Sequence, residues 1–140
     1  MIIFTKIDLK LLQQEGKEFK WDRPYCNKCK CSFYGHGYVL RFFNLLDSGI
    51  YLKRWRCPRC KTVATVRPDT HWTRFQESIQ QIFKTLIYRV KHFKWPPWCT
   101  RQRGGHWFNK LIANARLNLL LKENLLETIF FYQNKNLTIS

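Results

Sequence analysis

The sequence predicts an α+β fold, in which a small β-hairpin ribbon is followed by a helical, helix-turn-helix-like bundle. Two Cys-x-x-Cys pairs flank a stretch of β-forming residues with a turn signal at its centre. After Pro68 the apolar residues change to helical spacing. The chain has 140 residues, 45% of them hydrophobic and 16% aromatic. It can therefore bury the core of one domain or of two small ones.

Four segments are expected along the chain. They are an N-terminal extension that packs on the ribbon (1–23), the ribbon (24–68), a helix-turn-helix-like helical region (69–121), and a C-terminal helix and tail (122–140).

The formal charge of +16 is concentrated in the middle of the chain. The net charge is +1 over residues 1–25, +7 over 26–73, +8 over 74–121 and 0 over 122–140. An excess of Lys and Arg favours association with phosphate-bearing polyanions. Its confinement to the two middle quarters indicates a ligand there rather than general solubilisation.

The N-terminus meets the charged residues Lys6 and Asp8 directly after Met1-Ile-Ile-Phe4, so it lacks the apolar stretch of a signal peptide. No run approaches the roughly 20 apolar residues of a membrane span. We therefore expect a cytoplasmic protein with no membrane partner. In a reducing compartment, cysteines are better suited to metal binding than to disulfides.

Five of the six cysteines lie in two groups, Cys26-Asn-Lys-Cys29-Lys-Cys31 and Cys57-Pro-Arg-Cys60. Two residues between cysteines let the chain form a knuckle that directs two thiolates at one ion, and two knuckles complete a tetrahedral Zn²⁺ site. We predict zinc on Cys26, Cys29, Cys57 and Cys60, with Cys31 as the alternative to Cys29. A closed set of four cysteines is structural and argues against zinc-dependent catalysis.

Two histidines are further candidate metal ligands by type alone, whereas the sixth cysteine is not one. His36 and His71 are substitute ligands, although a single His near a ribbon is more often a surface residue. Cys99 has no partner in the sequence, so we expect it to be buried or inert.

The 27 residues between the two cysteine pairs predict a hairpin that brings the knuckles together. Its strands are Tyr38–Phe43 and Ile50–Trp55, with a turn at Asp47-Ser-Gly49, and a third strand follows at Thr62–Val66. The aromatic, Gly-containing segment Gly35–Phe42 is also typical of RNA-recognition sheets. The helices that such a sheet interleaves with its strands are missing, so the hairpin is preferred.

A first helix is predicted from an apolar stripe at helical spacing. The stripe consists of Phe75, Ile79, Ile82, Phe83, Leu86, Val90 and Phe93. Thr73 and Gln76 form a capping box at its start, and Lys94-Trp-Pro-Pro97 ends it. The opposite face carries Arg74, Lys84, Arg89 and Lys91, which are either solvated or follow a phosphate backbone.

A short helix capped by Thr100, a break at Gly104-Gly105 and a longer helix from about residue 106 complete a helix-turn-helix outline. The longer helix is expected to present His106, Asn109, Lys110, Asn114 and Arg116. A plain helical hairpin with a wet polar face is the alternative. Residues 122–133 repeat a helical stripe without net charge (Leu125, Leu126, Ile129 and Phe130), which covers the core or pairs with a second copy in a homodimer.

Four pieces of sequence occur in a familiar order. They are Pro24-Tyr-Cys-Asn-Lys-Cys29, Leu52-Lys-Arg-Trp-Arg-Cys-Pro-Arg-Cys60, Thr65-Val-Arg-Pro68, and Arg101-Gln-Arg103 before His106-Trp107. Through these pieces, residues 24–116 resemble the N-terminal zinc-ribbon and helix-turn-helix region of bacterial insertion-sequence transposases and the small ribbon proteins that accompany them. The resemblance implies zinc on the cysteines and element-end DNA on the helices. The acidic triad of those transposases has no room here, so integration chemistry is not expected.

We therefore expect a zinc-stabilised protein that binds double-stranded DNA, a mobile-element accessory or regulatory factor that is not an enzyme. The nine acidic residues include no close pair in a cleft-like motif. The expected nucleic-acid contacts are Lys53, Arg54, Arg56, Arg59 and Lys61 on the ribbon, and Arg101, Arg103, His106, Asn109, Lys110 and Asn114 on the helices. The alternatives are an adapter that docks a transposase or another large nucleic-acid enzyme, and an RNA-binding zinc ribbon.

Overall fold

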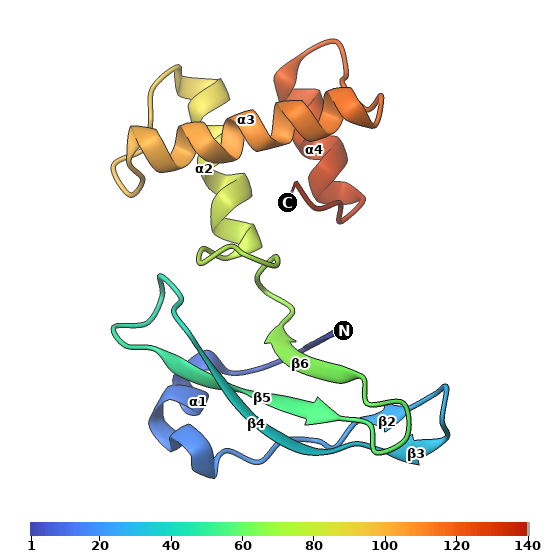
Figure 1. Cartoon of the computed structure of the whole chain (residues 1–140). Helices are drawn as coiled ribbons and strands as arrows, with labels where there is room; N and C mark the ends of the chain where they lie inside the picture. The colour runs from blue at the N-terminus through green and yellow to red at the C-terminus, as the bar shows by residue number, and fades with distance from the viewer. Residues whose placement is uncertain (140) are drawn as a thin grey trace. The chain divides into compact units, whose positions relative to one another are not determined.

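The computed structural model describes residues 1–139 and divides the chain into two compact units (Figure 1). The first unit comprises Met1–His71, and the second begins at Trp72. The first unit contains the β-sheet, and the second contains three longer helices. The mixture of strands and helices that the sequence predicts is confirmed.

The first unit is built on a four-stranded sheet in the order β1-β6-β5-β4. Its strands are β1 (Ile2–Thr5), β4 (Tyr34–Arg41), β5 (Ile50–Arg56) and β6 (Val63–Pro68). Strand β5 pairs antiparallel with β4 and β6, whereas β1 pairs parallel with β6. This pairing confirms the predicted hairpin and third strand. They form because β-forming residues flank a turn at both connections.

Strand β4 begins four residues before the predicted start at Tyr38. A register shift between Gly35 and Tyr38 accommodates the extra length, and Gly37 adopts a φ of 79° within it. Glycine takes this conformation without steric cost. The irregularity therefore lets β4 stay paired with β5 as far as Arg56.

The N-terminal segment contains two elements that sequence reasoning did not locate, β1 and helix α1 (Leu9–Glu15), with a 3₁₀ turn, η1 (Gly16–Glu18), behind α1. The Asp8 carboxylate caps α1 by accepting hydrogen bonds from the backbone N–H groups of Lys10 and Leu11 at 3.1 and 3.2 Å. Leu9 and Leu12 are buried in a cluster with Phe43, Ile50 and Leu52. The extension thus packs on the sheet.

A second core cluster of this unit surrounds the cysteines. It comprises Cys26, Phe33, Trp55, Cys57, Ala64 and Val66. A two-stranded sheet consists of β2 (Tyr25–Cys26) and β3 (Cys31–Ser32). Its two strands lie at either end of the first Cys-x-x-Cys pair. Trp55 contributes to this cluster, while Ile50 and Leu52 of the same strand contribute to the cluster with α1.

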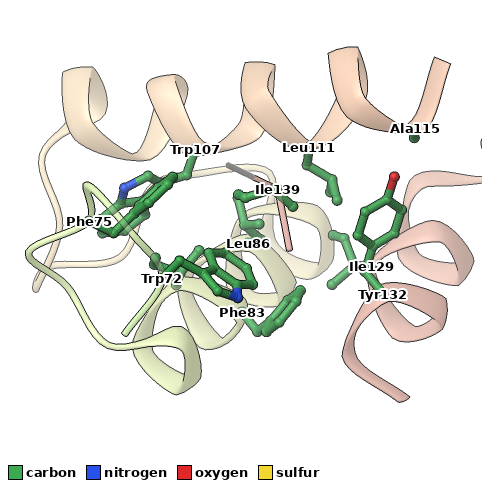
Figure 2. Packing of buried hydrophobic residues seen from close by; sticks show 11 residues of the cluster. Trp72, Phe75, Phe83, Leu86, Trp107, Leu111, Ala115, Ile129, Tyr132 and Ile139 are labelled. Atoms are coloured by element: carbon green, nitrogen blue, oxygen red, sulfur yellow. The ribbon is translucent and has the colours of Figure 1, made fainter. Parts of the chain in front are cut away.

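The second unit consists of α2 (Ile79–His92), α3 (Arg101–Leu117) and α4 (Leu125–Asn134) around one apolar core. Figure 2 shows the side chains of Trp107 and Leu111 pointing from α3 into the core, where Leu86 of α2 and Ile129 and Tyr132 of α4 also lie. The predicted C-terminal helix is confirmed. Of its predicted stripe, Ile129 is buried, whereas Phe130 is 37% exposed.

The predicted start of the first long helix is wrong. Helix α2 is capped by Ser78, whose Oγ accepts from the Gln81 N–H at 3.2 Å, and not by a Thr73 and Gln76 capping box. Phe75 is buried ahead of the helix, with its ring 5.6 Å from that of Trp72, and Arg74 has a φ of 70°. Burial of this aromatic pair outweighs the local capping signal.

The predicted break at Gly104-Gly105 is also wrong, because α3 runs through both glycines. Thr100 caps the helix as expected, since its Oγ1 accepts from the Arg103 N–H at 3.2 Å. A Cβ at Gly104 would collide with the ring of Trp95, so this glycine permits close packing. The predicted short helix and turn are therefore the first turns of one helix.

Among residues 1–139, no helix is long and apolar enough to span a membrane.

Candidate metal centre

Two knuckles of the same local conformation carry the cysteine pairs. In the first, the Lys30 N–H donates to the Cys26 carbonyl at 2.8 Å; in the second, the Lys61 N–H donates to the Cys57 carbonyl at 3.1 Å. Lys30 and Lys61 have φ values of 56° and 63°, in the left-handed region. Each knuckle is thus a Cys-x-x-Cys-Lys turn in which the lysine reverses the chain. The hairpin β4–β5 and the strand β6 fix where the second knuckle begins and ends.

The four sulfurs of Cys26, Cys29, Cys57 and Cys60 all lie within 4.8 Å of one another. The Cys26 and Cys60 sulfurs are 3.9 Å apart. Sulfurs at 2.3 Å from a tetrahedral zinc would be separated by about 3.8 Å. Four close thiols are a donor set that fits a metal ion, and the structure therefore confirms that these four cysteines could hold one.

Burial and hydrogen bonding differ around the four thiols. Cys26 and Cys57 are buried, at 7% and 0% exposure, and the other two are half-buried. The Cys29 N–H donates to the Cys26 sulfur at 3.4 Å, and Thr62 Oγ1 lies 3.2 Å from the Cys60 sulfur. Such contacts orient metal-ligating side chains and stabilise their charged form.

The pKa values of the thiols divide between the two knuckles. Burial raises the pKa of Cys57, but hydrogen bonds from the backbone of Cys60 and Arg59 outweigh it and lower the pKa to about 6. Hydrogen bonds with the side chain and backbone of Thr62 lower the pKa of Cys60. Burial and the neighbouring thiols raise the pKa of Cys29 to about 12. The second knuckle thus favours thiolates, whereas the Cys29 thiol of the first releases its proton when a metal binds.

A fifth thiol lies next to the four. The Cys31 sulfur is 3.6 Å from that of Cys57, and burial with this contact raises the Cys31 pKa. The group of four sulfurs within 4.8 Å of one another contains Cys29 and not Cys31.

The other candidate ligands are engaged elsewhere in the protein. His71 is 2% exposed; its Nδ1 lies 2.8 Å from Thr70 Oγ1, and its ring packs edge-on against Phe43. His36 is half-buried with its ring edge-on to that of Tyr34. The Cys99 thiol donates to the Thr100 carbonyl at 3.4 Å, and burial raises its pKa.

The basic residues of the ribbon lie on β5 and on the second knuckle. Lys53, Arg54 and Arg56 are half-buried, whereas Arg59 and Lys61 are exposed. The Lys53 ammonium lies 4.5 Å from the Tyr38 ring centroid and 5.2 Å from that of Trp55. Arg59 donates to the Cys29 carbonyl at 3.4 Å and so links the two knuckles.

The helical candidates lie on α3 of the second unit. Arg101, Arg103, His106, Asn109 and Lys110 are exposed along its first half. Asn114 is half-buried, and its Oδ1 accepts hydrogen bonds from the Tyr132 hydroxyl at 2.6 Å and from Asn118 at 3.2 Å. Asn114 therefore joins α3 to α4.

Sequence reasoning missed the contributions of Lys30, Lys61 and Thr62 to the centre. The available signal was the repeated Cys-x-x-Cys-Lys string, followed in the second copy by Thr. No protein-family model matches the chain, and no curated protein or solved structure is similar to it at the threshold for a match.

Proposed function

We propose that this chain is a zinc-stabilised DNA-binding protein, an accessory or regulatory factor of a mobile element without a catalytic site of its own. The observation that carries the proposal is the four-thiol group on two basic knuckles. It is supported by a helical unit whose residues 78–122 contain nine Lys and Arg and no Asp or Glu.

Zinc is the metal that this donor set suits best. Four thiolates in a tetrahedral arrangement are the ligands of structural zinc sites, which leave no open position for a substrate. Bound zinc would supply folding energy to the ribbon. In this role the metal would fix the position of two basic residues relative to the sheet. They are Arg59, which precedes Cys60, and Lys61, which follows it.

Duplex DNA is the partner favoured by the charge and by the exposed side chains of α3. Lys and Arg neutralise phosphates, and Arg, Lys and Asn match the hydrogen-bonding edges of guanine and adenine. Arg101, Arg103 and Lys110 would position the helix, and His106 and Asn109 would contact bases. The resemblance of residues 24–116 to insertion-sequence ribbon proteins supports a role at the ends of a mobile element.

Fluorescence anisotropy with labelled duplex DNA tests the proposal. The logarithm of the affinity should fall linearly with the logarithm of salt concentration, with a slope that corresponds to about 5–8 phosphate contacts. Arg59→Ala with Lys61→Ala should weaken binding to every duplex alike. Asn109→Ala should reduce discrimination between a specific site and random DNA by roughly 1–3 kcal/mol.

Lys135→Ala is the matched control for the single variant Lys61→Ala, because both are exposed lysines outside the helices and each substitution removes one charge. It should leave affinity and salt slope within error of the parent. Equal losses in Lys135→Ala and Lys61→Ala would mean that only net charge drives binding, and the assignment of a DNA interface would then be wrong.

A protein adapter is the second candidate, and one observation favours it. The last residue of α3 and the segment that follows it expose three leucines, Leu117, Leu119 and Leu121, at 83%, 91% and 45%. Exposed apolar side chains in one segment are typical of docking surfaces. If the parent binds no duplex, the adapter becomes the better account; polar substitutions at Leu117 and Leu119 should then abolish binding to a purified transposase.

A further inference from the structure

The C-terminal end of α2 and the segment that follows it bring aromatic rings together. The Tyr88 ring centroid lies 4.3 Å from that of His92 and 5.2 Å from that of Trp98. Phe93 follows His92 directly. We use the name ring cluster for Tyr88 with its neighbours His92 and Trp98, together with Phe93, which is next to His92 in the sequence. His92, Phe93 and Trp98 are exposed, the last two at 85% and 41%.

Trp98 is held in place without being covered. Its Nε1–H donates to Thr85 Oγ1 at 3.0 Å, and the Thr85 hydroxyl donates to the Gln81 carbonyl at 2.8 Å. Thr85 is completely buried, so the indole is anchored by its polar edge to the interior of the unit. A fixed, partly exposed ring loses little conformational entropy when a ligand stacks on it.

Phe93 is an unusual residue for its position. It is the C-cap of α2 with a φ of 57°, a left-handed conformation in which Gly or Asn is normally found. A β-carbon costs roughly 1 kcal/mol there, and the ring remains 85% exposed. The Phe93 ring is therefore not used by the core and is open to a ligand at the surface of the unit.

One cation lies over a ring of the cluster, two more are next to the cluster in sequence, and acidic residues are absent from the same stretch. The Lys84 ammonium lies 4.7 Å from the Trp98 ring centroid, and Lys91 and Lys94 are exposed on either side of His92 and Phe93. No Asp or Glu occurs between residues 78 and 122. Rings interleaved with cations match a ligand that has both π faces and phosphates. Unpaired nucleotides have both, whereas the bases of a duplex are already stacked on one another.

We propose that the ring cluster binds single-stranded nucleic acid, with unpaired bases stacked on Phe93 and Trp98 and phosphates on Lys84, Lys91 and Lys94. This inference rests on the proposed nucleic-acid function and extends it from duplex to unpaired strand. Stacking tolerates any base, so the site has little sequence preference.

The test is anisotropy with labelled oligothymidylate of about 16 nucleotides and with an abasic strand of the same length. Phe93→Asn keeps the net charge and suits the left-handed backbone. Phe93→Asn with Trp98→Leu should lose about 5- to 150-fold in affinity for oligothymidylate, the equivalent of at least one stacked base. Its affinity for the abasic strand should not change.

Phe130→Leu is the matched control, because Phe130 is another exposed ring of this unit, on α4 and at 37% exposure. It should bind both strands as the parent does. Thermal unfolding checks that the variant with Trp98→Leu folds. If that variant does not fold, Phe93→Asn alone is the test, and it should lose affinity for oligothymidylate.

Four results would overturn the inference. Parental affinity of the double variant for oligothymidylate would exclude stacking on these rings. Equal affinity of the parent for oligothymidylate and for the abasic strand would mean that only charge drives binding at this site. The proposed duplex binding would still hold in that case if its affinity falls with salt as expected. Loss of binding to phosphatidylserine vesicles with no change on oligothymidylate would assign the rings to a membrane surface. Absence of binding to any nucleic acid would remove the proposed function and this inference together.

Discussion

Gly104 and Gly105 are neighbours in α3, yet their surroundings differ completely. A Cβ at Gly104 would collide with the ring of Trp95, whereas a Cβ at Gly105 would meet nothing within 4 Å. The Arg89 guanidinium lies 5.1 Å from the Trp95 ring centroid, and the Phe108 ring centroid lies 6.4 Å from it. Gly104 is therefore required by packing, and Gly105 only weakens the helix.

Alanine substitution should separate these two roles. Gly105→Ala should stabilise the second unit by about 0.5–1 kcal/mol, because alanine loses less backbone entropy in a helix. Gly104→Ala should destabilise it by about 1–3 kcal/mol through overpacking against Trp95. Urea unfolding followed by circular dichroism at helical wavelengths measures both. Equal stability of the two variants would contradict the packing of Trp95 on Gly104.

The two lysines that end the knuckles, like Gly104, occupy positions that are set by the surrounding structure. Lys30 and Lys61 adopt left-handed φ values that glycine normally supplies. The sequence contains the repeated Cys-x-x-Cys-Lys string, but lysine has no preference for this conformation. The position is therefore set by closure of each knuckle, with its hydrogen bond from the lysine N–H to the first cysteine's carbonyl.

At the scale of elements, the boundary of α2 shows how a local signal loses to burial. Thr73 and Gln76 have the spacing of a capping box, and Ser78 and Gln81 have the same spacing five residues later. The structure uses Ser78, because Trp72 and Phe75 enter the core ahead of the helix.

Cap substitutions should reveal which serine or threonine is used. Ser78→Ala should destabilise the second unit by about 0.5–2 kcal/mol, since the Gln81 N–H loses its acceptor. Thr73→Ala should change stability by less than about 0.5 kcal/mol. Denaturant midpoints at unchanged slope give both values. A larger loss in Thr73→Ala than in Ser78→Ala would place the start of the helix at the earlier box.

At the scale of the whole molecule, the two units have separate cores. The cysteines belong to a cluster with Phe33 and Trp55 in the first unit, while the core of the second unit consists of residues from Trp72 onward. Metal binding should therefore stabilise one unit and not the other.

Metal removal should unfold the first unit selectively. After chelation, backbone amide signals of residues 24–68 should collapse to unfolded positions in NMR spectra, while signals of α2, α3 and α4 persist. Cys29→Ser should have the same effect without a chelator. Cys31→Ser is the control and should retain one zinc per chain. Retention of zinc by Cys29→Ser and its loss from Cys31→Ser would exchange the two ligands.

Zinc affinity should also rise with pH. Metal displaces protons from thiols, so each thiol protonated in the free protein adds up to about a tenfold gain per pH unit. Because the ribbon unfolds without metal, its thiols have the ordinary cysteine pKa of about 8.5 in the free protein, so the effect extends across neutral pH. Competition with a chelating dye at several pH values measures the slope, and a flat profile would contradict thiol deprotonation on metal binding.

The hairpin, the third strand, α4 and the four-cysteine group follow from the sequence by itself, because they depend on short-range patterns. A Cys-x-x-Cys pair makes its own knuckle, and strands on either side of a turn pair with each other. The tertiary structure alone decided that Ile2–Thr5 forms β1, because its parallel partner β6 lies about 60 residues away. It also decided that Gly104 continues a helix and that Asn114 binds Tyr132, since each depends on a side chain from another part of the chain. Local patterns fix elements, whereas contacts between distant residues fix their boundaries and the use of their side chains.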